Sequence, residues 1–184
     1  RSLPTRVPPI AGEAIDSWLE ALAARTSTTW NDLLIALGLY TPRRRMRITT
    51  PWIVGLPPQQ SADLAEATGL DSAVLAAMTL SHYDDRVFQL TTTTRTVVNS
   101  ALWRRGTGSR YCPMCLAESG GRWPLAWRLG WTFACLKHRC LLVDTCPCCR
   151  AGPRVYPIPG CLTPTPNRCA RQPPGAAAGR IMRI

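Results

Sequence analysis

The stretch that decides the fold runs from Tyr111 to Arg150 and reads YCPMCLAESGGRWPLAWRLGWTFACLKHRCLLVDTCPCCR. It holds a Cys-x2-Cys pair, then a spacer of nineteen residues, then a Cys-x2-His pair. Their members are Cys112, Cys115, Cys135 and His138. Each pair turns tightly enough for both ligand atoms to reach one ion, and thiolates with one imidazole suit tetrahedral Zn²⁺. The stretch therefore predicts a zinc site, and its four protein ligands are typical of a closed, structural site.

A second zinc site is predicted directly after the first. Cys146 and Cys149 repeat the Cys-Pro-x-Cys form of the first pair, which makes them half of such a site. Two further cysteines in a Pro-rich segment are the candidates to complete it, although they lack the x2 spacing. The predicted ligands are Cys146, Cys149, Cys161 and Cys169.

Disulfides or inert buried thiols are the alternative for these cysteines. No secretory signal precedes them, and the count of nine is odd, which favours metal sites with spare thiols. Cys140 and Cys148 are then left over and are interpreted as small hydrophobic residues. A catalytic Cys–His pair is disfavoured, because His138 is taken as a ligand and His82 as a surface or helix-end residue.

The composition is strongly basic. There are 22 Lys and Arg residues against 11 Asp and Glu, which gives a formal net charge of +11 that filled metal sites would lower but not reverse. Most of the basic residues are Arg, which suits phosphate contacts, so a polyanion is a plausible partner. No apolar run approaches the ~18 residues of a membrane span. No paired carboxylates or phosphate loop indicates an enzyme.

Two amphipathic helices are expected near the N-terminus, packed antiparallel. The first, of about 12 residues, is indicated by a stripe at helical spacing, and the second begins at a capping box formed by Thr29 and Asp32 and ends near Gly38. Their apolar stripes consist of Ile15, Trp18, Leu19, Leu22 and Ala23 in the first and of Trp30, Leu33, Leu34 and Leu37 in the second.

A helix-turn-helix candidate follows. It comprises a short helix over residues 62–68, a turn at Gly69 and a second helix over residues 72–78 that is capped by Asp71. Because the second helix is almost bare of hydrogen-bond donors, a structural or protein-docking role is favoured over base readout.

Arginines dominate the residues proposed to contact nucleic acid. A basic, Pro-rich segment over residues 41–60 fits either a solvated linker or an arm that lies on phosphates. The candidates are Arg43, Arg44, Arg45, Arg47, Arg104, Arg105 and Arg110.

Tryptophan recurs every four residues inside the metal-binding stretch, at Trp123, Trp127 and Trp131. On a helix these rings would share one face. They fit either the core of a small metal module or an exposed platform for stacking bases, and the core is favoured because little charge is interleaved among them.

The predicted fold class is mainly α, with small zinc-binding α+β modules. A helical region with the helix-turn-helix-like unit and the basic linker spans residues 1–108, and a zinc-finger or zinc-ribbon-like domain spans residues 109–170. A flexible tail is expected over residues 171–184.

Two segments of the sequence resemble the TniQ family. One is Pro-x-x-Gly-Glu-x-x-x-Ser-Trp-Leu-x-x-Leu-Ala, from Pro9 to Ala23. The other is Tyr-Cys-Pro-x-Cys-Leu, a Trp-rich spacer, Cys-x-x-His, Leu-Leu and Cys-Pro-x-Cys, from Tyr111 to Cys149. The resemblance implies metal-ligand roles for Cys112, Cys115, Cys135, His138, Cys146 and Cys149. It also implies a second Cys-x2-Cys pair after Cys149, where this sequence offers only Cys161 and Cys169, with Gln172 beyond.

The same resemblance implies a non-enzymatic adaptor of DNA transposition in the bacterial cytoplasm. Such proteins join a target-recognition device, either a CRISPR effector with its guide RNA or a DNA attachment site, to an AAA+ ATPase on DNA and so to the transposase. The main alternative is an autonomous DNA-binding transcriptional regulator that uses the helix-turn-helix and the zinc unit. A zinc hydrolase is disfavoured by the closed ligand set.

Overall fold

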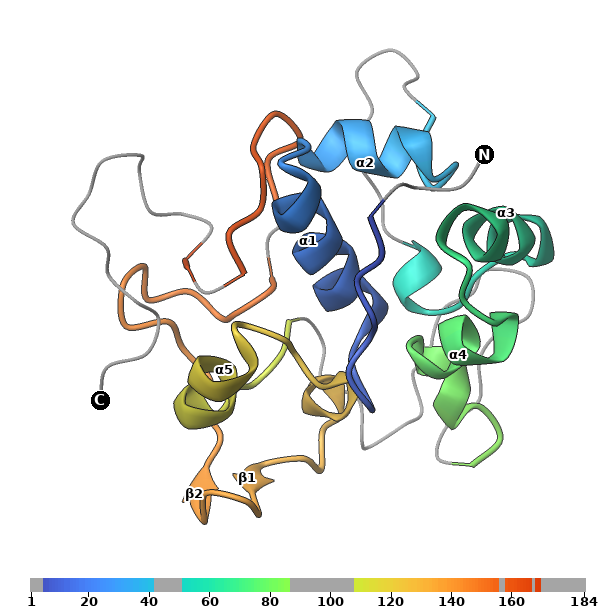
Figure 1. Cartoon of the computed structure of the whole chain (residues 1–184). Coiled ribbons are helices and arrows are strands. Elements are labelled where there is room, and N and C mark those ends of the chain that lie inside the picture. Colours follow the sequence, from blue (N-terminus) through green and yellow to red (C-terminus); the bar gives the residue numbers. More distant parts are fainter. Residues whose placement is uncertain (1–4, 42–50, 87–107, 156–157, 167, 170–184) are drawn as a thin grey trace.

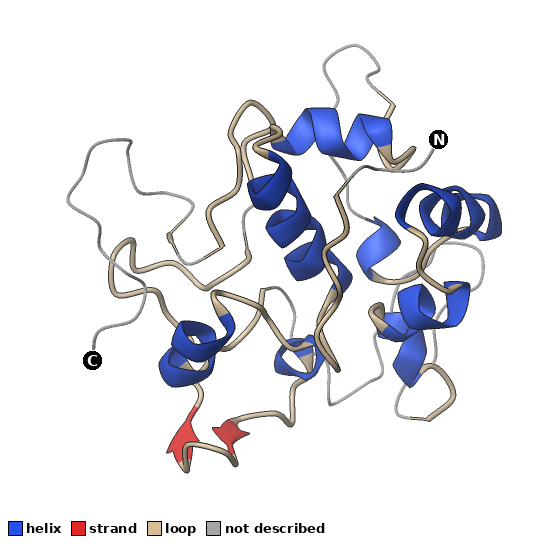
Figure 2. Ribbon diagram, viewed as in Figure 1, coloured by secondary structure: helices blue, strands red, loops and turns tan. Residues whose placement is uncertain are grey.

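The computed structural model describes residues 5–41, 51–86, 108–155, 158–166 and 168–169. Over these residues the chain is mainly helical and carries one small two-stranded sheet, as Figure 2 shows. The expected fold class is confirmed to that extent. Among the described residues, no helix combines the length and the apolar character that crossing a membrane requires. The expected tail over residues 171–184 lies outside the described residues.

Helix α1 (Ile15–Thr26) has the expected twelve residues and lies at the centre of the structure. It ends where Ser27 takes a left-handed conformation. Helix α2 (Trp30–Ala36) begins at the predicted capping box, since the Thr29 hydroxyl accepts a hydrogen bond from the Asp32 N–H and donates one to its carboxylate. The expected antiparallel packing is wrong, because α2 runs across the end of α1 (Figure 1).

Helices α3 (Pro58–Thr68) and α4 (Ser72–Ala77) form the expected helix pair. Helix α3 begins earlier than predicted because Pro58 occupies its first position, where a missing N–H costs nothing. Gly69 ends it with φ 72°, and the Asp71 carboxylate caps α4 by accepting from the Ala73 N–H. A short turn between two packed helices is therefore present, while its use as a helix-turn-helix stays a prediction.

One apolar core joins these four helices. Both predicted stripes are buried in it, together with Trp52 from the 3₁₀ turn Pro51–Ile53 and with Leu64 and Leu75 from α3 and α4. The ring centroids of Trp30 and Trp52 lie 6.4 Å apart. The 3₁₀ turn Leu80–Tyr83 follows α4.

The cysteine-rich part folds around short elements. Helix α5 (Pro113–Ser119) is followed by a 3₁₀ turn, Leu125–Arg128, and by strands β1 (Ala134–Cys135) and β2 (Cys140–Leu141). The strands pair antiparallel, with Ala134 opposite Leu141 and Cys135 opposite Cys140.

The tryptophans between the two ligand pairs do not share a helix face. Pro124 and Gly130 limit the helical segment to the single turn Leu125–Arg128, so the helix interpretation of the spacing is wrong. Trp123 and Trp127 are buried, with their rings edge to face at 5.8 Å. The expected core role is confirmed for these two rings, whereas Trp131 is half-buried.

Helix α1 also contacts the cysteine-rich part through its N-terminal end. The buried Glu13 carboxylate accepts two hydrogen bonds from the Arg122 guanidinium, at 2.5 and 2.6 Å. The Ser17 hydroxyl donates to Glu13 and accepts from the Trp123 N–H, and the Ala14 N–H donates to the Trp123 carbonyl. The regions expected on either side of residue 108 are thus in direct contact.

A second group of buried charges continues this contact along α1. The Asp16 carboxylate pairs with Arg128 and Arg154, and Glu20 pairs with Arg154 at 2.6 Å. Burial alone would raise the pKa of Asp16, but the two guanidinium charges outweigh it and hold this pKa below its usual value. At Glu20 burial, helped by the negative charge of Asp16, outweighs the guanidinium groups of Arg154 and Arg128 and raises the pKa to about 7.

Candidate metal centre

The first predicted ligand set is brought together. The ligand atoms of Cys112, Cys115, Cys135 and His138 all lie within 4.8 Å of one another. Cys112 is the N-cap of α5, Cys115 lies in its first turn, Cys135 ends β1, and His138 lies in the turn before β2. Two short turns on different elements therefore meet at one point.

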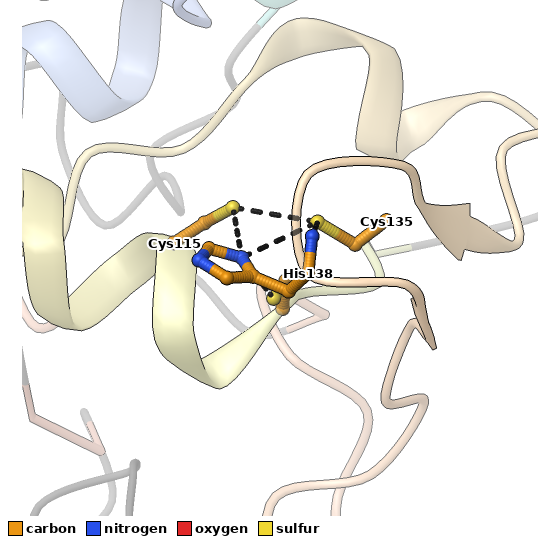
Figure 3. A group of neighbouring side chains, drawn as sticks. Cys115, Cys135 and His138 are labelled. Carbon is orange, nitrogen blue, oxygen red and sulfur yellow. Dashed lines mark hydrogen bonds between the residues drawn. The ribbon is translucent and has the colours of Figure 1, made fainter.

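The distances within this group fit a tetrahedral zinc ion. His138 Nδ1 lies 3.3, 3.2 and 3.5 Å from the sulfurs of Cys112, Cys115 and Cys135, and the sulfurs of Cys115 and Cys135 are 3.6 Å apart. In a tetrahedron with Zn–S near 2.3 Å and Zn–N near 2.0 Å, a sulfur and the nitrogen lie about 3.5 Å apart and two sulfurs about 3.8 Å apart. Figure 3 shows the His138 ring directed toward the thiols of Cys115 and Cys135.

Glu118 orients the imidazole. Its carboxylate oxygen lies 3.0 Å from His138 Nε2, so the other ring nitrogen, Nδ1, faces the thiols. A carboxylate on the far nitrogen fixes the ring and makes the near nitrogen a better metal ligand.

The three thiols of this group resist being deprotonated together unless a cation is bound between them. Burial and the neighbouring sulfurs of Cys135 and Cys112 raise the pKa of Cys115 to about 12. Burial opposes ionisation of Cys135 too, but the His138 N–H and the neighbouring thiols outweigh it and lower its pKa to about 7. A divalent cation supplies the charge that would hold all three deprotonated.

Cys140 lies beside this group without belonging to it. Its sulfur is 3.8 Å from that of Cys112, on the strand position opposite Cys135. Burial raises the pKa of its thiol, so Cys140 is suited to donate an S–H hydrogen bond to a metal-bound Cys112. The interpretation of Cys140 as a mere hydrophobic residue missed this contact, which the strand register creates.

The second predicted ligand set is brought together in part. The sulfurs of Cys146, Cys149 and Cys169 lie within 4.8 Å of one another, whereas Cys161 lies outside this group and is exposed. Cys146 and Cys149 belong to a tight turn in which the Cys146 carbonyl accepts from the Arg150 N–H at 2.8 Å. Three sulfurs at this spacing fit zinc or another thiophilic ion and leave one coordination position to be filled.

Cys161 is held away by its neighbours in the chain. The carbonyl oxygens of Gly160 and Leu162 accept hydrogen bonds from the N–H groups of Asn31 and Trp30, each at 2.9 Å. These are the first backbone donors of α2, which have no partner within the helix. The segment around Cys161 thus serves as a cap for α2.

Most of the predicted nucleic-acid contacts, Arg43, Arg44, Arg45, Arg47, Arg104 and Arg105, lie outside the described residues. Arg110 is described, and its guanidinium is used within the molecule. It donates to the carbonyls of Gly130 and Thr132, both at 2.9 Å, and pairs with Asp144 at 3.1 Å. Arg110 therefore braces the loop before β1, and a contact of Arg110 with nucleic acid stays a prediction.

The charged face of α1 was missed by reasoning from the sequence. Glu13, Asp16 and Glu20 recur at helical spacing beside the apolar stripe, and that spacing was the available signal. This spacing would have indicated a polar face on the helix. It would not have indicated that arginines far along the chain cover that face.

A comparison with curated proteins found no match. Residues 4–142 match the TniQ family, and this range includes α1, its contact with Trp123 and the complete first cysteine–histidine group. The match spans most of the 184 residues. The chain therefore belongs to the TniQ family of non-catalytic, transposition-associated adaptors.

Proposed function

We propose that this chain links target-site recognition to the AAA+ ATPase regulator of a transposon, and through that regulator to the transposase. The family match over residues 4–142 carries the proposal. The target is recognised either by a CRISPR effector with its guide RNA or through a DNA site, and the chain performs no chemistry itself.

The closed first metal group supports a structural role. Its four protein ligand atoms would fill a tetrahedral coordination shell, which would leave no site on the ion for a substrate or a water nucleophile. Zn²⁺ in this group would hold α5 against the β1–β2 hairpin and supply part of the folding free energy of the module. We propose a second Zn²⁺ on Cys146, Cys149 and Cys169, with a fourth ligand from outside these three.

Buried contacts with α1 support a bridging role. One helix packs its apolar face into the helical core and its acidic positions onto the metal module. An adaptor must hold two partners in a fixed relation, and a helix that is packed into one core and ion-paired to the neighbouring module provides a stiff connection between them.

The surface of α4 argues against an autonomous sequence reader. Its exposed residues are Ser72, Ala73, Val74, Ala76 and Ala77, which offer almost no side-chain donor to a base edge. We propose that DNA is contacted through phosphates by Arg43, Arg44, Arg45, Arg47, Arg104 and Arg105.

Co-elution with the AAA+ regulator of the same element tests the proposal. The regulator is assembled on duplex DNA with a non-hydrolysable ATP analogue, this chain is added, and zinc is counted in the shared peak. Co-elution that requires the nucleotide supports the adaptor function. Absence of co-elution, combined with tight, sequence-dependent binding of the chain alone to DNA, would replace it with the regulator alternative.

A further inference from the structure

The β1–β2 hairpin carries apolar side chains that the molecule leaves in water. Leu136 is 91% exposed, Leu141 is 72% exposed and Phe133 is 61% exposed, and no other large hydrophobic side chain among the described residues is more exposed than these. A single exposed leucine needs no explanation, but several within one short hairpin indicate an interaction surface.

The metal group places a further apolar residue at the same end of the module. Met114 lies between the ligands Cys112 and Cys115, just as Leu136 lies between Cys135 and His138, and Met114 is 45% exposed. Because the two ligand pairs meet at one point, the residues between them are brought to the same end.

The exposure does not result from a frayed strand. Below the hairpin tip, the Leu142 N–H donates to the Phe133 carbonyl at 2.8 Å, and Tyr111 and Val143 form a backbone bridge. Leu142 is buried, so the hairpin has an inner side that packs and an outer surface that does not. In Figures 1 and 2 the two strands project at the margin of the structure, away from α1–α4.

Positive charge lies directly beside these apolar residues. Lys137 and Arg139 are exposed neighbours in the turn between β1 and β2, and Arg139 takes a left-handed conformation with φ 50°. Lys137 pairs with Glu118, but the two side chains are 66% and 50% exposed. The pair therefore contributes little to stability, and Lys137 can exchange Glu118 for a carboxylate of a partner. The surface therefore offers apolar contacts with cationic groups at their edge.

We propose that Leu136, Leu141 and Arg139 form a docking surface for a partner protein that presents apolar side chains beside carboxylates. Nucleic acid would match the charges, but its phosphates give no apolar counterpart to two exposed leucines. Burial of the leucines supplies affinity, and the basic edge selects an acidic partner surface. The AAA+ regulator is the partner that the proposed function names, and this last identification rests on that function.

Three variants of the full-length chain test the surface. Leu136→Ser/Leu141→Ser removes the apolar contacts, and Arg139→Glu reverses the edge charge. Leu162→Ser is the matched control, since Leu162 is a leucine that is 43% exposed and lies outside the proposed surface. All three should keep the zinc content and the thermal midpoint of the wild type, because they change exposed positions. Affinity is measured for the regulator assembled on DNA with a non-hydrolysable ATP analogue.

The double variant should raise the Kd by about tenfold or more, and Leu162→Ser should leave it unchanged. Arg139→Glu should also raise the Kd, with the largest increase at low salt. If wild type binds and the double variant binds equally well, the docking surface is overturned while the adaptor function stands. If wild type does not bind at all, the proposed function fails first. Weakened DNA binding of the chain alone, or loss of a dimer in light scattering without loss of affinity, would also overturn the proposal.

Discussion

Replacing Arg154 with Met removes the guanidinium that joins the loop after Cys149 to helix α1. Arg154 is almost buried, with 10% of its side chain exposed, and it pairs with Asp16 and Glu20. Its guanidinium carbon also lies 4.7 Å from the centre of the Trp123 ring. Methionine keeps much of the apolar stem, so the substitution mainly deletes the charge and its hydrogen bonds.

The expected loss of unfolding free energy is about 3 kcal/mol, the lower end of the range for breaking a buried ion pair. The lower end applies because Asp16 keeps Arg128 as a partner and Glu20 can take up a proton. Loss of the cation–π contact adds about 1 kcal/mol or less.

Urea unfolding at pH 8, with saturating zinc and a reductant, measures this loss through tryptophan fluorescence. Glu20→Gln/Arg154→Met should be at least about 1 kcal/mol more stable than Arg154→Met alone, because no buried carboxylate is then left unpaired. Lys137→Met is the control at an exposed ion pair and should leave the unfolding free energy nearly unchanged, since Lys137 and its partner Glu118 are 66% and 50% exposed. A loss below about 1 kcal/mol in Arg154→Met, or no recovery in the double variant, would refute the assigned role.

Further predictions concern the metal groups and Glu20. Elemental analysis should find that Cys169→Ser loses the second zinc and that Cys161→Ser keeps both zinc ions. Loss of a zinc ion in Cys161→Ser would show that Cys161 is a ligand after all. Glu118→Gln should weaken zinc binding about tenfold in competition with a chelator, and unchanged affinity would deny it a role in orienting His138. Because burial raises the pKa of Glu20 from 4.5 to about 7, the folded state holds its proton between these values and its contribution to stability falls as pH rises through them. Glu20→Gln should therefore gain stability relative to wild type between pH 5 and pH 8, by up to about 3 kcal/mol; a relative loss would mean that the Arg154 pair dominates.

Features set by neighbours in the sequence were predictable. The apolar stripe of α1 and the Thr29–Asp32 capping box follow from helical spacing, and both are confirmed. The grouping of Cys112, Cys115, Cys135 and His138 follows from two tight turns, which the sequence spacing encodes directly.

Features set by distant partners were not predictable in this way. Cys161 was placed with Cys169 because both follow Cys149, but the backbone around Cys161 caps α2 instead. The four-residue spacing of the tryptophans suggested a helix, yet Pro124 and Gly130 confine it to one turn, and burial of two rings arises from contacts with Tyr111 and each other.

The buried charges on α1 suggest why the metal groups matter beyond their own module. A buried ion pair contributes little net stability compared with an apolar contact, but it tolerates few relative orientations of the two surfaces. Arg154 follows the Cys146–Cys149 turn, and Arg122 follows α5, whose N-cap is Cys112 and whose first turn carries Cys115. Metal binding that fixes these turns therefore also fixes the guanidinium groups that meet Glu13, Asp16 and Glu20. Zinc bound at these groups would determine not only whether the module folds but also how the helical region is oriented relative to the hairpin surface that we propose for docking.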